Sequence, residues 1–363
     1  MLTRWEILFI CVMTIPIMGH VVILPLMIDV AGRDTWISVL LSLPAALFFA
    51  FAIYKLRLAY PRLSGKEIAA KVLGKWMEKA FTALFVIYFL FLTVLSFAAL
   101  IDHVHIMYLP ETPHVALILW FMIFFIYAAV KGIKRIALTA GVLTFIGMIT
   151  GHTVTLMDST KKDWGELTPI LEYGWSPVFW GALVLISIWV ELFIILFAPI
   201  QNIKTKRTFL VWSIAIFIVS LTMNSTTTGV IMIFGLEQAD NFLYPATEIV
   251  RIIELGFIDR FDTYAMILMT LGTYIRCSLF FRFVYELGVE PIDSKWLKRI
   301  AGGLFVLIVF FGTLFIAKEH YRLEATVNFY TYLIVLYPIP FLLLILSWMK
   351  RKKADRIQTE KVE

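Results

Sequence analysis

The residue that most needs a chemical explanation is Glu191, which lies near the middle of the apolar stretch Leu183–Pro199. This stretch is long enough to cross a bilayer. A carboxylate at that depth is costly, so such residues usually face a cavity or a partner and take part in function. The alternative is a structural role, in which Glu191 is protonated or bound to a neighbouring helix. Arg276, in a later apolar stretch, either neutralises Glu191 or extends to a membrane interface.

Polar and helix-breaking residues interrupt the first apolar stretch of the chain. Pro16, Gly19 and Pro25 disturb its helical pattern, and Thr14 and His20 lie beside the break. Pro and Gly are tolerated in spanning helices where neighbouring groups satisfy the freed backbone. Unwound backbone near the bilayer centre is also how many transporters bind their substrates. An ordinary proline kink is the alternative interpretation.

The composition is that of a membrane protein. Of the 363 residues, 61% are hydrophobic and 16% are charged, whereas soluble domains are about half apolar and about a quarter charged. The net charge of +6 comes from loop residues that orient the chain, so it does not indicate nucleic-acid binding. The chain has no P-loop, dinucleotide, zinc or nucleophile-elbow motif. The sequence therefore predicts no enzyme, and no metal or cofactor site.

About 20 apolar residues span the hydrocarbon core, and ten stretches of the chain qualify. Basic residues concentrate in the loops on the side of the N-terminus, which predicts that both termini are cytoplasmic. Residues 1–350 then form one polytopic bundle, and residues 351–363 form a charged cytoplasmic tail. The predicted spans are approximately Trp5–Ile28, Trp36–Leu56, Ala80–Ile101, Val115–Val130, Ile136–Leu156, Val178–Pro199, Phe209–Phe234, Tyr264–Tyr285, Ile300–Ala317 and Thr326–Trp348.

Ten spans divide into five and five, with repeat one at about residues 5–156 and repeat two at about 178–348. The broken first span and the Glu191 span then correspond, as expected for an inverted repeat with its site at the repeat interface. A small polar ligand would lie between helices 1, 3, 6 and 8, with its charged ends on backbone groups near Ile17–His20 and Ser187–Glu191. The predicted ligand-binding residues are Thr14, Ile17, Gly19, His20, Phe97, Ser187, Trp189, Glu191 and Tyr274, of which Phe97 and Tyr274 rest on position alone.

Two loops have helical patterns of their own. The loop Gly235–Asp262 is predicted to be extracellular, with a short helix that begins at Pro245. The basic segment Lys55–Lys79 is amphipathic, which predicts a helix on the cytoplasmic surface against anionic lipid. Its apolar face would consist of Ile68, Ala69, Val72, Leu73 and Trp76.

Three segments resemble motifs of the spore germinant receptor B subunits. Residues 31–38 (AGRDTWIS) are similar to a motif that follows the first helix of that family. Residues 188–192 (IWVEL), with Pro199 and the basic Lys204–Arg207 after them, resemble its sixth-helix motif. Residues 244–251 (YPATEIVR) and 258–262 (IDRFD) resemble its outer loop. The three matches keep their order and cover most of the chain.

This resemblance implies a member of the amino acid–polyamine–organocation transporter superfamily. It implies an all-α LeuT-like fold of ten transmembrane helices in a five-plus-five inverted repeat, with helices 1 and 6 broken near a substrate site. It also implies a subunit that senses a germinant, usually an amino acid, beside a receptor A subunit and a lipoprotein C subunit in the inner membrane of the spore. The chain departs from the family pattern at Met18–His20 and Ile188–Val190, where small residues are usual.

Two other functions fit the same residues. In a proton-coupled amino acid transporter, Glu191 would alternate between protonated and ionised forms, and the shared fold does not separate this function from sensing. In a structural scaffold, the bundle would only hold a partner complex. The scaffold alone predicts that the substitution Glu191→Gln leaves a ligand response intact.

Overall fold

The computed structural model describes residues 1–201, 203, 207–253 and 262–359, but not the side chains of His20 and residues 353–359. Within these residues the chain forms helices joined by turns and short loops, as expected where lipid cannot satisfy backbone polar groups. This described part contains nine helices long and apolar enough to cross a membrane. The chain is therefore an all-α, multi-pass membrane protein.

The long elements of the first half are joined by tight turns or short 3-10 segments. Those segments are η2 (Gly32–Asp34), η3 (Ser159–Lys161) and η4 (Trp164–Leu167). The helices are α2 (Leu24–Ala31), α3 (Thr35–Ala59), α4 (Gly65–Leu73), α5 (Lys75–Met107), α6 (His114–Lys131) and α7 (Ile133–Met157). In the second half they are α8 (Trp175–Trp189), α9 (Phe193–Phe197), α10 (Thr208–Asp240), α11 (Pro245–Arg251), α12 (Thr263–Gly288), α13 (Lys295–Ala317), α14 (His320–Thr331) and α15 (Ile339–Thr359).

The first predicted span is divided into three pieces. α1 (Arg4–Ile17) begins with a capping box between Thr3 and Glu6, which satisfies two backbone N–H groups. It contains Pro16 and ends in a π-helical segment, η1 (Met18–Val22). α2 then begins with Pro25 in its first turn, where a missing N–H costs little.

Two other apolar segments change helix type near their middle. α8 and α9 are joined through the 3-10 segment η5 (Val190–Leu192), which contains Glu191. α14 and α15 are likewise joined through η6 (Tyr332–Leu336). α15 continues through the first part of the predicted tail and ends at Thr359.

The nine candidate spans differ from the ten predicted spans at the start of the chain. With 14 residues, α1 is too short to cross a membrane alone, while Leu24–Ala59 counts as one candidate of 36 residues. These lengths follow from the π segment that separates α1 from α2. The ten-span topology, the inverted repeat and the orientation of the termini stay predictions.

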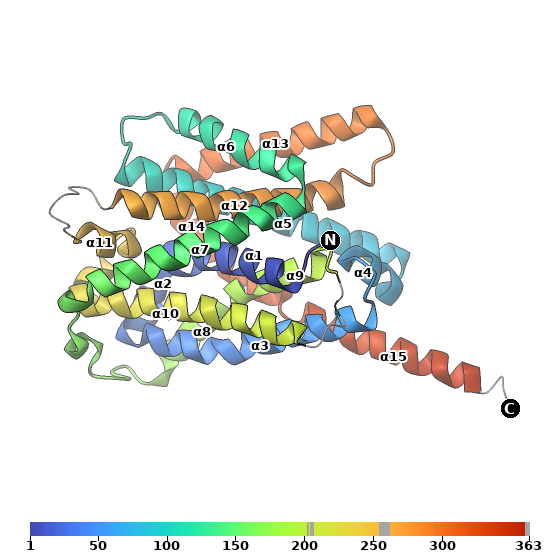
Figure 1. Ribbon diagram of the computed structural model, residues 1–363, viewed down its shortest axis with the longest axis horizontal. Coiled ribbons are helices and arrows are strands. Elements are labelled where there is room, and N and C mark those ends of the chain that lie inside the picture. Colours follow the sequence, from blue (N-terminus) through green and yellow to red (C-terminus); the bar gives the residue numbers. More distant parts are fainter. Residues whose placement is uncertain (202, 204–206, 254–261, 360–363) are drawn as a thin grey trace.

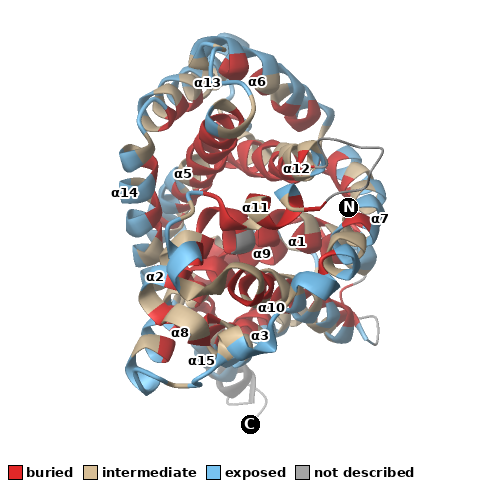
Figure 2. Ribbon diagram, turned by 90° about the vertical axis from the view of Figure 1, so that its left-hand side faces the viewer, coloured by how far each residue is buried: buried red, intermediate tan, exposed pale blue. Residues whose placement is uncertain are grey.

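The helices run along one long axis and enclose a buried centre. The N-terminus and the last turns of α15 lie towards one end of the bundle, and α11 lies at the opposite end (Figure 1). α6 and α13 form an outer layer that packs against α5 and α12 (Figure 1). Seen along the axis, α1 and α9 lie near the middle, where most of the ribbon is buried (Figure 2). Polar residues that reach this centre are therefore shielded from solvent and lipid.

The amphipathic helix α4 packs on protein rather than on lipid. Ile68 and Ala69 are 0% exposed and Val72 is 2% exposed, and α4 contacts α5, α9 and α15. The prediction that these three residues face anionic lipid is therefore wrong, because neighbouring helices cover this face of α4. Trp76, at the start of α5, is 84% exposed.

Candidate functional site

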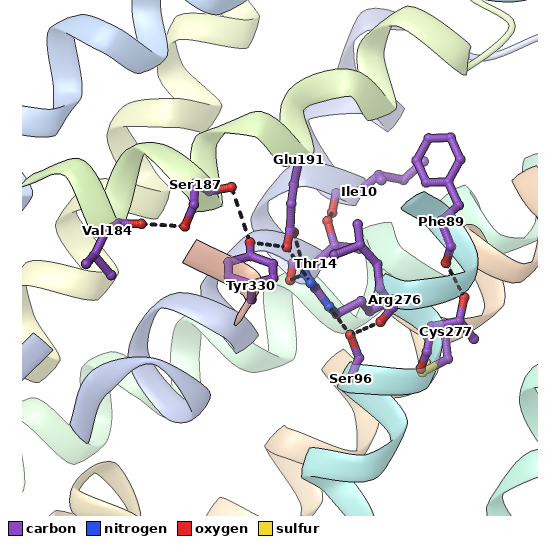
Figure 3. A network of polar contacts seen from close by, with 12 residues as sticks. Ile10, Thr14, Phe89, Ser96, Val184, Ser187, Glu191, Arg276, Cys277 and Tyr330 are labelled. Carbon is purple, nitrogen blue, oxygen red and sulfur yellow. Dashed lines mark hydrogen bonds and ion pairs between the residues drawn. The ribbon is translucent and has the colours of Figure 1, made fainter. Parts of the chain in front are cut away.

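Glu191 and Arg276 form an ion pair in the buried centre of the bundle (Figure 3). Arg276 Nη1 donates to Glu191 Oε2 and Nη2 donates to Oε1, each at 2.5 Å, and both side chains are 0% exposed. Parallel hydrogen bonds of this kind are strong because both groups are planar and oppositely charged. Arg276 therefore pairs with Glu191 instead of extending to a membrane interface.

Three further groups surround the ion pair. The Tyr330 hydroxyl donates to Glu191 Oε1 at 2.6 Å, and Arg276 Nε donates to Ser96 Oγ at 2.6 Å. Arg276 Nη1 also donates to the Thr14 carbonyl oxygen at 2.8 Å. Five elements far apart in the sequence, α1, α5, η5, α12 and α14, thus meet at one pair of charges (Figure 3). We call Thr14, Ser96, Glu191, Arg276 and Tyr330 the ion-pair centre.

The interruptions of the helices position this centre. In a regular α-helix the N–H of Met18 would donate to the Thr14 carbonyl, but here it donates to Ile15. The Thr14 carbonyl instead accepts from Arg276. Glu191 lies within the 3-10 segment η5, and such short departures from α-helical geometry often occur at functional sites.

Aromatic residues of α5 and α12 complete the surroundings. The Arg276 guanidinium carbon lies 4.9 Å from the centroid of the Phe280 ring, which adds a cation–π contact. Tyr88 is buried within electrostatic range of Glu191 and Arg276. Among the described residues its hydroxyl has no hydrogen-bond partner. A buried hydroxyl without a partner is costly, so the Tyr88 hydroxyl could take a further hydrogen-bond partner.

The predicted ligand-binding residues of α8 and η5 point in different directions. The Ser187 carbonyl lies 3.4 Å from the Tyr330 hydroxyl, at the edge of the centre, while the Ser187 hydroxyl donates to Val184. Trp189 is buried but turns away, because its Nε1 donates to Ser42 of α3 at 2.9 Å. Trp189 thus packs between α8 and α3 rather than at the ion-pair centre.

The helix 1 residues mainly pack against other helices. A Cβ added to Gly272 of α12 would lie 2.5 Å from Ile17 Cδ1, so Ile17 occupies the space that this glycine leaves. A Cβ added to Gly19 would lie 2.4 Å from Met223 Cε, so Gly19 allows close approach of α10. The side chain of His20 lies outside the described part of the structure.

Phe97 and Tyr274, chosen on position, lie together at a different place. Both line a cavity of about 420 Å³ between α5, α6 and α12. Phe97 follows Ser96 and Cys277 follows Arg276, so this cavity lies behind the ion-pair centre rather than within it. Its lining residues are Phe97, Leu100, Phe121, Phe124, Phe125, Tyr127, Thr270, Leu271, Thr273, Tyr274 and Cys277.

Sequence reasoning did not find Ser96, Tyr330, Tyr88 and Phe280. Ser96 and Tyr330 lie within apolar spans, but each has other polar residues close by in the sequence, so neither stands out as Glu191 does. Nothing in the sequence shows which of the many tyrosines and phenylalanines point inward. That selection depends on helix rotation, which a single sequence does not determine.

Interrupted helices around a buried ion pair define a class of protein. Charged residues inside membrane bundles face the interior and pair with one another, and interrupted helices at such sites are typical of transporter-type proteins. The chain is thus a multi-pass helical membrane protein with a buried ion pair where its helices are interrupted.

Comparison with known proteins gives the family. Residues 1–323 match the spore permease family, described as spore germination protein, and the chain belongs to this family. It is 27% identical to spore germination protein XB of Bacillus anthracis over 97% of this chain and 99% of that protein. It is 24% identical to spore germination protein KB of Bacillus subtilis (strain 168) over 92% of each chain. Spore germination protein YndE of the same strain is 25% identical over 88% of each chain.

The family confirms the resemblance drawn from the sequence motifs. It supports a germination-related membrane protein of receptor or transporter type rather than an enzyme. Of the motif segments, Lys204–Lys206 and residues 258–261 lie outside the described part of the structure.

Proposed function

We propose that this protein is the germinant-sensing membrane subunit of a spore germination receptor, and that it binds a small amino acid at the ion-pair centre. The observation that carries this proposal is the Glu191–Arg276 pair, which is fully buried where interrupted segments of separate helices meet. A buried ion pair is weak evidence for stability alone, because desolvation offsets most of its Coulomb attraction. A functional use explains why the pair is present.

The chemistry of the pair matches the two ends of an amino acid. Arg276 offers the planar donors that bind a carboxylate, and Glu191 offers acceptors for an ammonium group. A zwitterionic ligand would replace the internal pair by two equivalent pairs, one at each end. The Tyr88 hydroxyl, which has no partner within the described chain, would supply a further contact.

Such an exchange would favour one of two arrangements of the bundle. The described arrangement is closed, since both charged side chains are fully buried. Ligand binding would separate η5 from α12, the elements that carry Glu191 and Arg276. A ligand shifts such an equilibrium only by its difference in affinity for the two states. Replacing one buried ion pair by two pairs to the ligand supplies that difference.

The family resemblance extends this proposal to the setting of the protein. The subunit would lie in the inner membrane of the spore, with both termini in the cytoplasm and ten spans in a five-plus-five inverted repeat. Its partners would be a receptor A subunit and a lipoprotein C subunit, which would read the change in the bundle.

A germination assay with matched ligands tests the proposal. Spores that lack this subunit are complemented with the wild-type gene, Glu191→Gln, Arg276→Gln or the control Glu286→Gln. The control removes a carboxylate of α12 that pairs with Arg282 outside the centre. Each strain is exposed to amino acids, their amides and the matching N-acetyl compounds. We expect germination by the zwitterions only, and a loss of sensitivity of at least about tenfold in both centre variants.

Two results would contradict the proposal. One is an undiminished response of the Glu191→Gln and Arg276→Gln spores at normal protein level, as a structural scaffold predicts. The other is robust uptake of labelled amino acid, driven by a pH gradient, in proteoliposomes of the purified protein. That outcome would assign proton-coupled transport instead.

A further inference from the structure

A second buried cluster lies at the end of the bundle that carries α11. Asp102, near the end of α5, is 2% exposed. Its Oδ2 accepts a hydrogen bond from the hydroxyl of Tyr244, the residue before α11, and lies 2.7 Å from Nδ1 of His320 at the start of α14. One carboxylate thus joins three elements that are distant in the sequence. We call Asp102, Tyr244 and His320 the α11 latch.

Further contacts tie α11 to the same end of α5. His103 Nε2 lies 2.9 Å from Thr247 Oγ1 of α11, and the His103 ring lies 4.6 Å from the Tyr244 ring, edge to face. These contacts come from the residue next to Asp102. The two neighbouring residues of α5 therefore hold both the start and the first turn of α11.

α11 covers the interior of the bundle at this end. It contacts η1, α2, α10 and α12, and it lies across the middle of the bundle in the view along the axis (Figure 2). Ile249 of α11 packs in one buried cluster with Leu24 and Ile28 of α2 and Val230 of α10. On the side of α11 that faces the interior lies the π segment η1, which connects to α1 and hence to the Thr14 carbonyl. Access from this end to the ion-pair centre requires α11 to move.

We propose that Asp102, Tyr244 and His320 form a proton-dependent latch, which holds α11 closed while His320 is protonated and releases it when His320 is neutral. The protonated imidazole forms a charge-assisted hydrogen bond with the buried carboxylate. When the imidazole is neutral, Asp102 keeps its charge in a buried site but loses its counter-charge, which weakens the closed state. Histidine changes charge between about pH 5 and 8, so the switch operates in the physiological range.

The groups around the latch indicate that His320 is the residue whose change of charge with pH controls it. Burial and the Asp102 carboxylate raise the pKa of Tyr244 well above its ordinary value, so its phenol stays a donor. Glu324, one turn along α14, lies 3.6 Å from His320 Nε2 but is 60% exposed, so its effect is screened. The titratable and charged groups around the latch are Asp102, Tyr244, Glu324, His103, His114 and Glu319.

Thiol labelling of the full-length protein in proteoliposomes tests the latch. The natural cysteines are replaced (Cys11→Ala, Cys277→Ala), and Leu24→Cys places a thiol beneath α11, where Leu24 is 0% exposed. Labelling by a membrane-impermeant maleimide is normalised to Tyr173→Cys at an exposed position, which corrects for thiol ionisation. We expect Tyr244→Phe, Asp102→Asn and His320→Gln to raise the labelling rate at pH 6 by about tenfold.

The pH series and a control complete the test. With the native latch, normalised labelling should rise between about pH 5.5 and 8, and His320→Gln should abolish this rise. His152→Gln is the matched control, because His152 is exposed and its ring nitrogen bonds the Met148 carbonyl of the same helix α7. Size-exclusion chromatography verifies that each variant folds. If Asp102→Asn does not fold, the two single variants Tyr244→Phe and His320→Gln are sufficient for the test. Unchanged rates in these two variants, or a pH dependence that survives His320→Gln, would overturn the proposal.

This experiment needs no ligand. It therefore succeeds or fails independently of amino acid sensing at the ion-pair centre.

Discussion

At the scale of single residues, the ion-pair centre consists of two buried charges that neutralise each other. Glu191 and Arg276 satisfy each other's charges. Tyr330 donates a further hydrogen bond to Glu191, and Ser96 and the Thr14 carbonyl accept further hydrogen bonds from Arg276. Removing one partner leaves a buried charge unpaired, whereas removing both leaves an apolar contact. The two kinds of change should therefore differ strongly in cost.

The first prediction concerns this difference. Arg276→Met should lower the free energy of unfolding by about 3 to 5 kcal/mol, because Glu191 stays buried without a counter-charge. The double variant with Glu191→Leu should recover most of that loss but respond to no ligand. Thermal unfolding of the purified protein in detergent measures both effects.

Arg282→Met is the matched control for this pair. Arg282 pairs with Glu286 of the same helix and with Glu290, but the three side chains are 17%, 25% and 46% exposed. Its removal should cost no more than about 1 kcal/mol. An equal loss of stability in Arg282→Met and Arg276→Met would contradict the view that burial sets the cost.

The second prediction isolates the Tyr330 hydroxyl. Tyr330→Phe keeps the ring and removes the donor to Glu191 Oε1, which should cost about 1.5 to 3 kcal/mol, the range for a hydrogen bond to a charged group. The variant should stay in the membrane and respond to ligand at a changed concentration. Dose–response curves of complemented spores give that shift. A curve identical to that of the wild type would mean that Tyr330 lies outside the functional site.

At the scale of elements, the contact between α1 and α12 holds Thr14 against Arg276. Ile17, the last residue of α1, occupies the space that Gly272 leaves on α12. Small residues allow helices to approach closely in membranes, where packing rather than the hydrophobic effect drives association. The position of the Thr14 carbonyl thus depends on a glycine in another helix.

The third prediction follows from this contact. Gly272→Ala should destabilise the protein by about 1 to 3 kcal/mol, because its Cβ overlaps Ile17. Adding Ile17→Ala should restore much of the loss, since it frees the overlapping volume. The thermal unfolding midpoints of the single and double variants show whether Ile17→Ala restores the stability lost in Gly272→Ala. Gly151→Ala is a suitable control, since a Cβ there meets no atom within 4 Å. Additive effects in the double variant would refute the proposed overlap.

At the scale of the whole molecule, the two ends of the bundle differ. One end carries the N-terminus, the last turns of α15 and α4, and the other carries α11 and the latch (Figure 1). The bias of basic residues towards the first end predicts that it is cytoplasmic. This orientation places α11 and its latch on the outer side, where a germinant would arrive.

The fourth prediction tests this orientation. In the cysteine-free background, a membrane-impermeant maleimide should label Tyr173→Cys in intact cells, and should label Lys352→Cys only after permeabilisation. Both positions are exposed at opposite ends of the bundle. The reverse pattern of labelling would place α11 in the cytoplasm and would exclude the proposed route of the ligand.

The sequence by itself determined the class of fold and singled out Glu191. Twenty-residue apolar stretches can cross lipid only as helices, and a lone carboxylate among them is costly enough to stand out. Pro16, Gly19 and Pro25 similarly located the interruption of the first helix, because these residues disturb backbone hydrogen bonding wherever they occur. The motifs at residues 31–38, 188–192 and 244–251 identified the family.

Only the tertiary structure decided which side chains meet. The rotation of each helix directs Glu191 towards Arg276 and Trp189 towards Ser42. Only Val190 lies between Trp189 and Glu191 in the sequence. The same packing adds Tyr330 and Ser96 to the centre and moves Phe97 and Tyr274 to a cavity behind it. Rotation is set by contacts between helices distant in the sequence, so it cannot be read from any one of them.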